Sequence, residues 1–253
     1  RRGVSIRSKL VKVFLVVLMG AFCCTASAEP SESNGNNLDA QAASSANNLK
    51  QWGIVFKMYA NESKGCLFPP YGAPGRLMCD HKEVFPEYLC DLNICISPLN
   101  PVAETYQTMD GVEPADVVND SSYVYLSHAL TSARDVDTFV AACKKWAKGQ
   151  GSMEEDLDSG ADQKIYRIRE GVERFLITDI SDPTAAVLMV QTIPVMLERR
   201  EFYPDGTANV LFLDGHVARI APGHDSLIDK IYAAIEELRP TRTEHKSDLA
   251  EKK

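Results

Sequence analysis

The sequence lacks the short motifs that mark several large enzyme classes. It has no P-loop, no dinucleotide-binding glycine fingerprint, no nucleophile elbow and no zinc-protease motif. It also has no internal repeat, and no pair of its cysteines has the CxxC spacing. These absences exclude the enzyme classes and repeat architectures that depend on such motifs. We therefore assign no catalytic, cofactor-binding or metal-ligating residue, and we expect a protein that is not an enzyme.

Positive charge is also scarce. The 253 residues include 27 Lys and Arg against 35 Asp and Glu, which gives a formal net charge of −8. Such a surface repels nucleic acid and anionic lipid headgroups. The 45% hydrophobic content is ordinary for a globular protein. We therefore expect no nucleic-acid partner, and we look instead to protein partners or self-assembly.

The longest apolar run, residues 13–24, is too short to span a bilayer as a helix. Basic residues precede it, and the small-residue triplet 26–28 follows it, just before Glu29. This is the pattern of an export signal that is removed by a signal peptidase. We predict an export signal over 1–28, a mature chain that begins at Glu29, and a periplasmic or extracellular location.

A polar segment, 29–37, has the composition of a flexible linker and precedes a predicted long helix. Four apolar residues at helical spacing put one continuous stripe on that helix, which begins near Asn37 or Leu38. They are Leu49, Trp52, Phe56 and Tyr59. Gly65 is a suitable left-handed stop. We expect this stripe to be the inner wall of the fold.

The run NNLKQWGIVFKMYANESKGCLFPP, residues 47–70, resembles the opening of a pilin-like family related to the type II secretion pseudopilins. The stretches 84–98, 166–186 and 207–220 support the resemblance. In the last of them, Asp214-Gly215 matches the end of the family's C-terminal signature of His, nine residues and Asp-Gly, but Pro204 stands in the place of the His. The resemblance implies an α+β fold with a long N-terminal helix on a small antiparallel sheet, and a role in secretion or pilus-like assembly.

The resemblance also opens an alternative for the N-terminus. The segment RRGVSI is similar to a prepilin peptidase site with cleavage after Gly3, although Ser8 stands where the family carries Glu. Cleavage there would retain the apolar run and anchor the protein in the inner membrane. A membrane partner is expected only in that case.

Downstream, alternating apolar residues predict strands at 122–126, 193–197, 208–213 and 216–220. Amphipathic patterns predict helices at 135–148, capped by Asp135, at 166–179 and at 225–239. The charged residues of the second helix would form ion pairs within it. We divide the chain into a globular domain over 38–223, a C-terminal helix over 224–240 and a disordered tail over 241–253.

The Asp214-Gly215 pair predicts a two-residue type I′ hairpin, because both of its central positions need a positive φ. Val210 and Phe212 of the preceding strand share one face, which we expect to pack on the long helix. Asp214 and His216 together also suggest an alternative function, an extracytoplasmic binding or hydrolytic domain that uses this face.

Five cysteines remain after the export signal, and in an oxidising compartment they can pair. We predict at least one disulfide among Cys66, Cys79, Cys90 and Cys95, and we expect Cys143 to be an unpaired, buried thiol. The acidic loop 151–162 offers oxygen ligands of the type that calcium prefers, but without the spacing of an EF-hand. We therefore expect no cofactor, with calcium at this loop as the one alternative.

Overall fold

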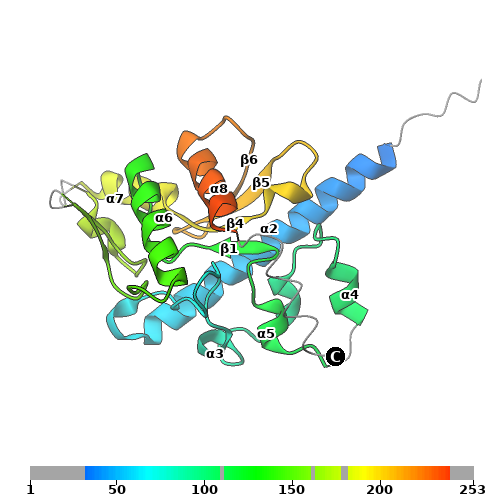
Figure 1. The fold of residues 1–253 in the computed structure, drawn as a ribbon. Coiled ribbons are helices and arrows are strands. Elements are labelled where there is room, and N and C mark those ends of the chain that lie inside the picture. The colour runs from blue at the N-terminus through cyan, green and yellow to red at the C-terminus, as the bar shows by residue number, and fades with distance from the viewer. Residues whose placement is uncertain (1–31, 109–110, 161–162, 178–181, 240–253) are drawn as a thin grey trace, which may run out of the picture. The chain divides into compact units, whose positions relative to one another are not determined.

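A computed structural model describes residues 32–108, 111–160, 163–177 and 182–239 of the chain (Figure 1). The chain divides into two units, 1–38 and 39–253, and the following account concerns the second. The expected export signal, 1–28, and the expected tail, 241–253, lie outside the described residues. Among the described helices, none has the length and apolar character needed to cross a bilayer.

The described elements make this an α+β protein, as the sequence predicts. The helices are α2 (Glu32–Glu62), α3 (His81–Val84), α4 (Ala103–Thr108), α5 (Pro114–Val117), α6 (Ala133–Ala147), α7 (Pro183–Thr192) and α8 (Ser226–Leu238). The strands are β1 (Tyr123–Tyr125), β2 (Leu157–Gly160), β3 (Gln163–Ile165), β4 (Pro194–Glu198), β5 (Ala208–Phe212) and β6 (Val217–Ile220). Short 3₁₀ turns are η1 (Lys64–Cys66), η2 (Leu92–Cys95), η3 (Val172–Phe175) and η4 (Arg200–Phe202).

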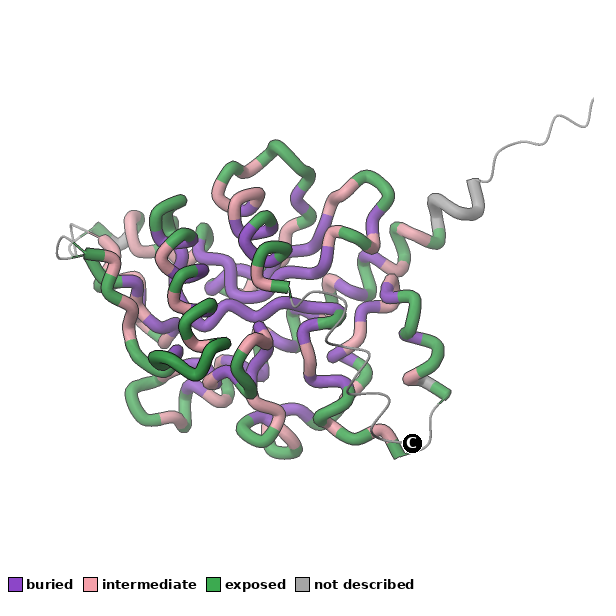
Figure 2. Tube along the Cα trace, viewed as in Figure 1, coloured by how far each residue is buried: buried purple, intermediate pink, exposed green. Residues whose placement is uncertain are grey.

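The main sheet has four antiparallel strands in the order β1-β4-β5-β6. The four strands predicted from alternation are these four, so this part of the prediction is confirmed. Every residue of β1, β4 and β5 is buried, and Figure 2 shows the buried trace running through the middle of this unit. A strand that is buried at every position must be covered on both faces of its sheet.

Helix α2 covers one face. Leu49, Trp52 and Phe56 are fully buried, and the Phe56 ring centroid lies 4.8 Å from that of Tyr125 on β1. Tyr59 is half-buried at the margin of the stripe. The predicted inner wall is therefore confirmed at its first three positions.

The ends of α2 differ from the prediction. The helix begins at Glu32, so it includes residues 32–37 of the expected linker, and it ends at Glu62. Gly65 does adopt a left-handed conformation, with φ of 78°, but within η1. The chain therefore leaves the helix one turn before the glycine that was predicted to stop it.

The sheet face that meets α2 is the opposite of the predicted one. A Cβ placed on Gly53 would lie 3.3 Å from Leu211, and Asn209 donates a hydrogen bond to the carbonyl of Ala42 at 2.9 Å. Alternation then directs Val210 and Phe212 away from α2. The prediction was wrong because β5 carries apolar residues on both faces, Leu211 on one and Val210 and Phe212 on the other, so its pattern does not show which face the helix covers.

Helix α8 lies on the other face. Val124 points away from α2, since its neighbours Tyr123 and Tyr125 point toward it. Val124 lines a cavity with Tyr232 and Ile235 of α8. Figure 1 shows α2 and α8 on opposite sides of the sheet, with α6 beside α8. The C-terminal helix is thus part of the same unit as the sheet.

Helices α6 and α8 are both capped at their N-termini by side-chain oxygens that accept hydrogen bonds from free backbone N–H groups. Asp225, the first residue of the predicted helix, caps α8 by accepting from the N–H groups of Leu227 and Ile228. The cap of α6 is Ser132 rather than Asp135. Asp135 is the third helical residue and completes a reciprocal capping box.

The predicted helix over 166–179 is wrong within the described residues. Arg167 and Arg169 form isolated bridges with His128 and Leu67, so the segment is extended, and only η3 is helical. The Arg167 and Arg169 guanidinium groups reach other parts of the chain: Arg167 donates to the Phe68 carbonyl, and Arg169 pairs with Asp156. Among the described residues of the segment, only Arg174 pairs within it, with Glu173. Gly171, with φ of 80°, separates the extended part from η3.

The β5–β6 turn also differs from the predicted one. Phe212 N–H donates to the carbonyl of His216 at 3.0 Å, and Gly215 N–H donates to that of Phe212 at 2.9 Å. Gly215 has φ of 95°, whereas Asp214 is not among the residues with positive φ. The connection is therefore a three-residue loop whose last residue is a left-handed glycine.

Candidate functional site

Asp214 and His216, the residues of the alternative function, lie together on this turn. Asp214 Oδ1 is 2.6 Å from His216 Nδ1 and 3.0 Å from the backbone N of His216. The imidazole stacks on Phe212, with ring centroids 4.5 Å apart and planes 3° apart. Neither Asp214 nor His216 lines either of the cavities described below. These contacts account for the pair as a stabilised turn, and they favour no reaction.

A buried carboxylate that the sequence did not reveal joins α2 to the sheet. Glu198, the last residue of β4, is 0% exposed. Its Oε1 accepts hydrogen bonds from Ser45 Oγ at 2.6 Å and Ser97 Oγ at 2.5 Å. Its Oε2 accepts from Tyr203 OH at 2.6 Å and Asn209 Nδ2 at 2.9 Å. Four donors offset the cost of burying a charge here.

The same residue also binds α8, because Tyr232 OH donates to the Glu198 backbone carbonyl at 2.7 Å. Burial, and then the charge of Glu198, raise the pKa of Tyr203 far above its ordinary value. This keeps the phenol protonated as a donor. Glu198 therefore fixes both helices on the sheet, and its role is structural.

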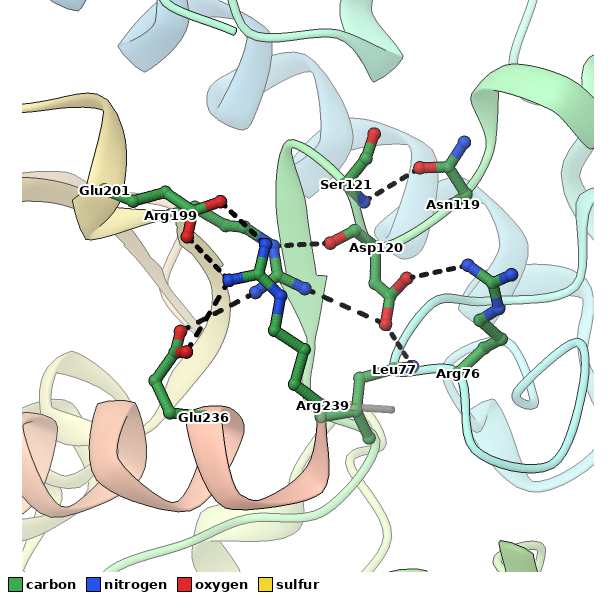
Figure 3. A network of polar contacts seen from close by, with 9 residues as sticks. All are labelled: Arg76, Leu77, Asn119, Asp120, Ser121, Arg199, Glu201, Glu236 and Arg239. Atoms are coloured by element: carbon green, nitrogen blue, oxygen red, sulfur yellow. Dashed lines mark hydrogen bonds and ion pairs between the residues drawn. The ribbon is translucent and has the colours of Figure 1, made fainter. Parts of the chain in front are cut away.

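A second polar cluster surrounds Arg199, which is 7% exposed (Figure 3). Its Nε donates to the Asp120 carbonyl at 2.7 Å, and its Nη2 lies 3.9 Å from the Asp120 carboxylate. That carboxylate also accepts from the Leu77 N–H at 3.3 Å and from Arg76 at 3.4 Å. Burial lowers the pKa of Arg199, and the charge of Asp120 opposes that change.

The outer part of this cluster is exposed. Arg239, just after α8, forms a two-pronged ion pair with Glu201 at 2.7 and 2.8 Å. Glu236 lies between the two arginines, with one oxygen 3.6 Å from Arg239 and the other 3.9 Å from Arg199. Figure 3 shows the two guanidinium groups side by side, with the three carboxylates around them.

Two of the cavities in the described part of the chain are large enough to be considered as binding sites. The first, of about 360 Å³, has mostly apolar walls and lies among the 75–77 loop, the end of α6 and the end of α8. Trp146, Ala147 and Leu238 are among its lining residues. The second, of about 230 Å³, lies between η4 and α8, beside the Arg199 cluster. Its walls include the charged side chains of Arg199, Arg200, Asp229 and Glu236.

The five cysteines that follow the expected export signal all lie in the described part of the chain, and all are free thiols there. Cys79 and Cys95 are buried, and burial raises the pKa of both thiols above the ordinary value. Cys143 is buried, as predicted, and its pKa is raised to about 12 by burial. The predicted disulfide remains a prediction for the protein in an oxidising compartment.

The acidic loop is partly ordered by its own backbone contacts. Residues 157–160 form β2 and pair with β3, and Asp158 Oδ1 accepts from Gly160 N–H at 2.8 Å. Asp156 accepts from the Arg167 N–H and from Arg169. Asp162 lies outside the described residues. Within the described ranges, no group of three or more His, Cys, Asp or Glu is placed to hold a metal ion.

An exposed apolar surface is formed by two neighbouring elements, η3 and α7. Phe175 of η3 is 54% exposed, and Val187 and Leu188 of α7 are 55% and 57% exposed. Helix α7 has no charged residue in its sequence PTAAVLMVQT. Apolar side chains that gather on a surface in this way form an exposed apolar patch. We call Phe175, Val187 and Leu188 the α7 surface.

Comparison of the chain with protein-family models, with curated proteins and with solved structures finds no match.

Proposed function

We propose that the chain is an exported, pilin-like structural or interaction protein that takes part in a type II secretion or pilus-like assembly. The proposal rests first on the resemblance of residues 47–70 to the opening of that family. These residues form the end of α2 and the turn after it, and α2 packs on an antiparallel sheet through Leu49, Trp52 and Phe56. The last of the supporting stretches, 207–220, contains the β5–β6 hairpin of the same sheet.

The observation that carries an assembly role is the α7 surface. Three large apolar side chains, each more than half exposed, lie on adjacent elements. Their exposure to water is unfavourable by about 25 cal/mol per Å² of apolar area, and a partner that covers them recovers that free energy. An assembly subunit requires such a surface, whereas an isolated binding domain does not.

The test of the assembly role is sedimentation velocity of the mature protein over a wide range of concentrations. We expect the parent to associate as concentration rises, and Leu188→Glu to remain monomeric, because a charge in the apolar contact cannot be solvated. Ala141→Glu, which adds the same charge at an exposed position of α6, is the matched control and should associate like the parent. Identical association of all three proteins, or a parent that is monomeric throughout, would contradict this use of the surface.

The location is tested separately by the intact mass of the native protein. A first residue of Glu29 fits a periplasmic or extracellular protein released by signal peptidase. A first residue of Val4 fits the alternative, an inner-membrane subunit whose apolar run is retained. This measurement decides how such a subunit is attached to its assembly.

A further inference from the structure

We propose that the 230 Å³ cavity between η4 and α8 binds a small organic acid, with its carboxylate held by Arg199 and Arg200. This inference goes beyond the assembly role. It is independent of that role, because the cavity residues come from β1, η4 and α8 and include none of the α7 surface.

The first step of the argument is an excess of hydrogen-bond donors. Three donors at the cavity, Arg199 Nη1, Arg200 Nε and Arg200 Nη2, are buried without a hydrogen-bond partner among the described residues, against one such acceptor, Asp229 Oδ1. Both arginines line the cavity, and Arg199 is more than nine-tenths buried. Guanidinium groups keep their charge in proteins, and buried donors without acceptors are unfavourable. An acceptor in the cavity would remove that cost.

The acids that already lie near these arginines do not meet the need. Asp229 Oδ1 lies 2.7 Å from Arg200 Nη1, and Asp229 Oδ2 accepts from the Gly223 N–H at 2.7 Å. Burial alone would raise the pKa of Asp229, but the Arg200 guanidinium and the Gly223 N–H outweigh it and lower the pKa. Asp229 is therefore ionised and orients Arg200 without reaching its other nitrogens.

Glu236 is the only acid within ion-pair distance of Arg199 Nη1 among the described residues, and the 3.9 Å separation exceeds a hydrogen bond. Its side chain is 61% exposed, so it can move into water at little cost. We infer that Glu236 lies at the mouth of the cavity and competes with the bound carboxylate for the guanidinium groups.

The walls specify the rest of the ligand. Val124, Ala233 and Ile235 contribute apolar surface, and the Arg200 guanidinium lies 4.0 Å above the Tyr232 ring, which holds it flat. A planar guanidinium matches the geometry of a carboxylate. The cavity is several times the roughly 30 Å³ that a water molecule occupies in the liquid. A carboxylate with a short hydrocarbon body fits both the donors and the apolar walls.

The experiment is isothermal titration of the full chain with butyrate, with acetate, inorganic phosphate and butylamine as comparison ligands. We expect butyrate to bind more tightly than acetate, because the hydrocarbon body adds apolar contact, and we expect no binding of butylamine. Arg200→Gln should weaken butyrate binding by about tenfold or more. Glu236→Gln should tighten it several-fold, because the competing charge is removed. Arg76→Gln, in the same cluster but outside the cavity lining, is the matched control.

The outcomes separate clearly. Tighter binding in Glu236→Gln supports the proposal even if Arg200→Gln fails to fold. Absence of butyrate binding at tens of millimolar overturns it, as does equal affinity in the parent, Glu236→Gln and Arg200→Gln. Binding of phosphate without butyrate overturns the assignment to an organic acid. If the parent protein binds butyrate but does not self-associate, only the assembly role is refuted. The two proposals therefore fail independently.

Discussion

Acidification should destabilise the fold through His128, which lies between β1 and α6 and is fully buried. Its Nε2 lies 2.9 Å from the Glu155 carbonyl oxygen, and its Nδ1 lies 2.9 Å from Ser127 Oγ. A carbonyl can only accept, so Nε2 carries the proton and the hydroxyl donates to Nδ1. The neutral ring thus has both of its hydrogen bonds satisfied, and a second proton has no acceptor except a reoriented hydroxyl.

The magnitude follows from the pKa of this ring. Burial, followed by the charges of Arg167 and Arg169, lowers the pKa of His128 from 6.5 to about 4, against the opposing effects of the Glu155 hydrogen bond and of Asp156. A depressed pKa means that the folded state resists protonation. The stabilisation is therefore complete above pH 6.5 and is lost as pH falls toward 4. The difference corresponds to about 3 kcal/mol at about 1.4 kcal/mol per pKa unit.

The assay is urea unfolding, followed by tryptophan fluorescence, at a series of pH values from 7 to 4. His128→Gln retains a donor and an acceptor but cannot gain a proton. The stability of this variant relative to the parent should therefore rise by about 3 kcal/mol over that range. The exposed His224→Gln is the control, and its curve should run parallel to the parent's. If the His128→Gln curve is also parallel to the parent's, the imidazole is not held neutral by burial and the reasoning fails.

Three further changes test the core. Phe56→Ala should lower the free energy of unfolding by about 3–5 kcal/mol, as large-to-small core changes do. Lys57→Ala loses only an exposed ion pair, and its free energy of unfolding should stay within about 0.5 kcal/mol of the parent's. Equal denaturant midpoints for Phe56→Ala and the parent would exclude Phe56 from the core. Glu198→Ala should cost about 3–5 kcal/mol because four donors lose their acceptor, and Glu198→Gln should cost less; a neutral Glu198→Ala would show that the cluster is not needed. Burial raises the pKa of Tyr71 and Tyr125 above 10, so stability should be complete below about pH 10 and fall above it by about 1.4 kcal/mol per pH unit for each. The part of the tyrosinate absorbance that is lost in Tyr71→Phe and in Tyr125→Phe should appear together with unfolding, and its appearance before unfolding would refute the burial of these residues.

Sequence patterns predicted correctly the helices and strands whose structure depends on residues that are close together along the chain. The stripe of Leu49, Trp52 and Phe56 specifies a helix and its buried side, and the Asp225 cap with its apolar spacing specifies α8. The strands β5 and β6 follow from alternation and the turn between them. In each case the residues that decide the structure lie within about one or two helical turns of each other.

Distant contacts decided the elements that the sequence did not predict correctly. The segment around Arg167 and Arg169 has helical charge spacing, but bridges to His128 and Leu67 hold it extended, because tertiary pairing overrides a weak local preference. Glu198 ends an apolar strand and looks like an ordinary boundary residue. Two of its donors, Ser45 and Ser97, are 153 and 101 residues away along the chain, so only the fold brings them to the carboxylate. The cavity beside Arg199 is hidden from the sequence for the same reason.

The Glu198 cluster has a mechanical consequence for a subunit that bears load along α2. Apolar contacts are non-directional, so hydrogen bonds between a helix and a sheet add a directional resistance to sliding. Here the carbonyl of Ala42 and the hydroxyl of Ser45 are bonded to Asn209 and Glu198, which belong to the two central strands of the sheet. A force along the helix axis therefore acts on these hydrogen bonds in shear, and it acts on all of them simultaneously. The force then passes into the β4–β5 ladder, whose own hydrogen bonds must slip together before α2 can move.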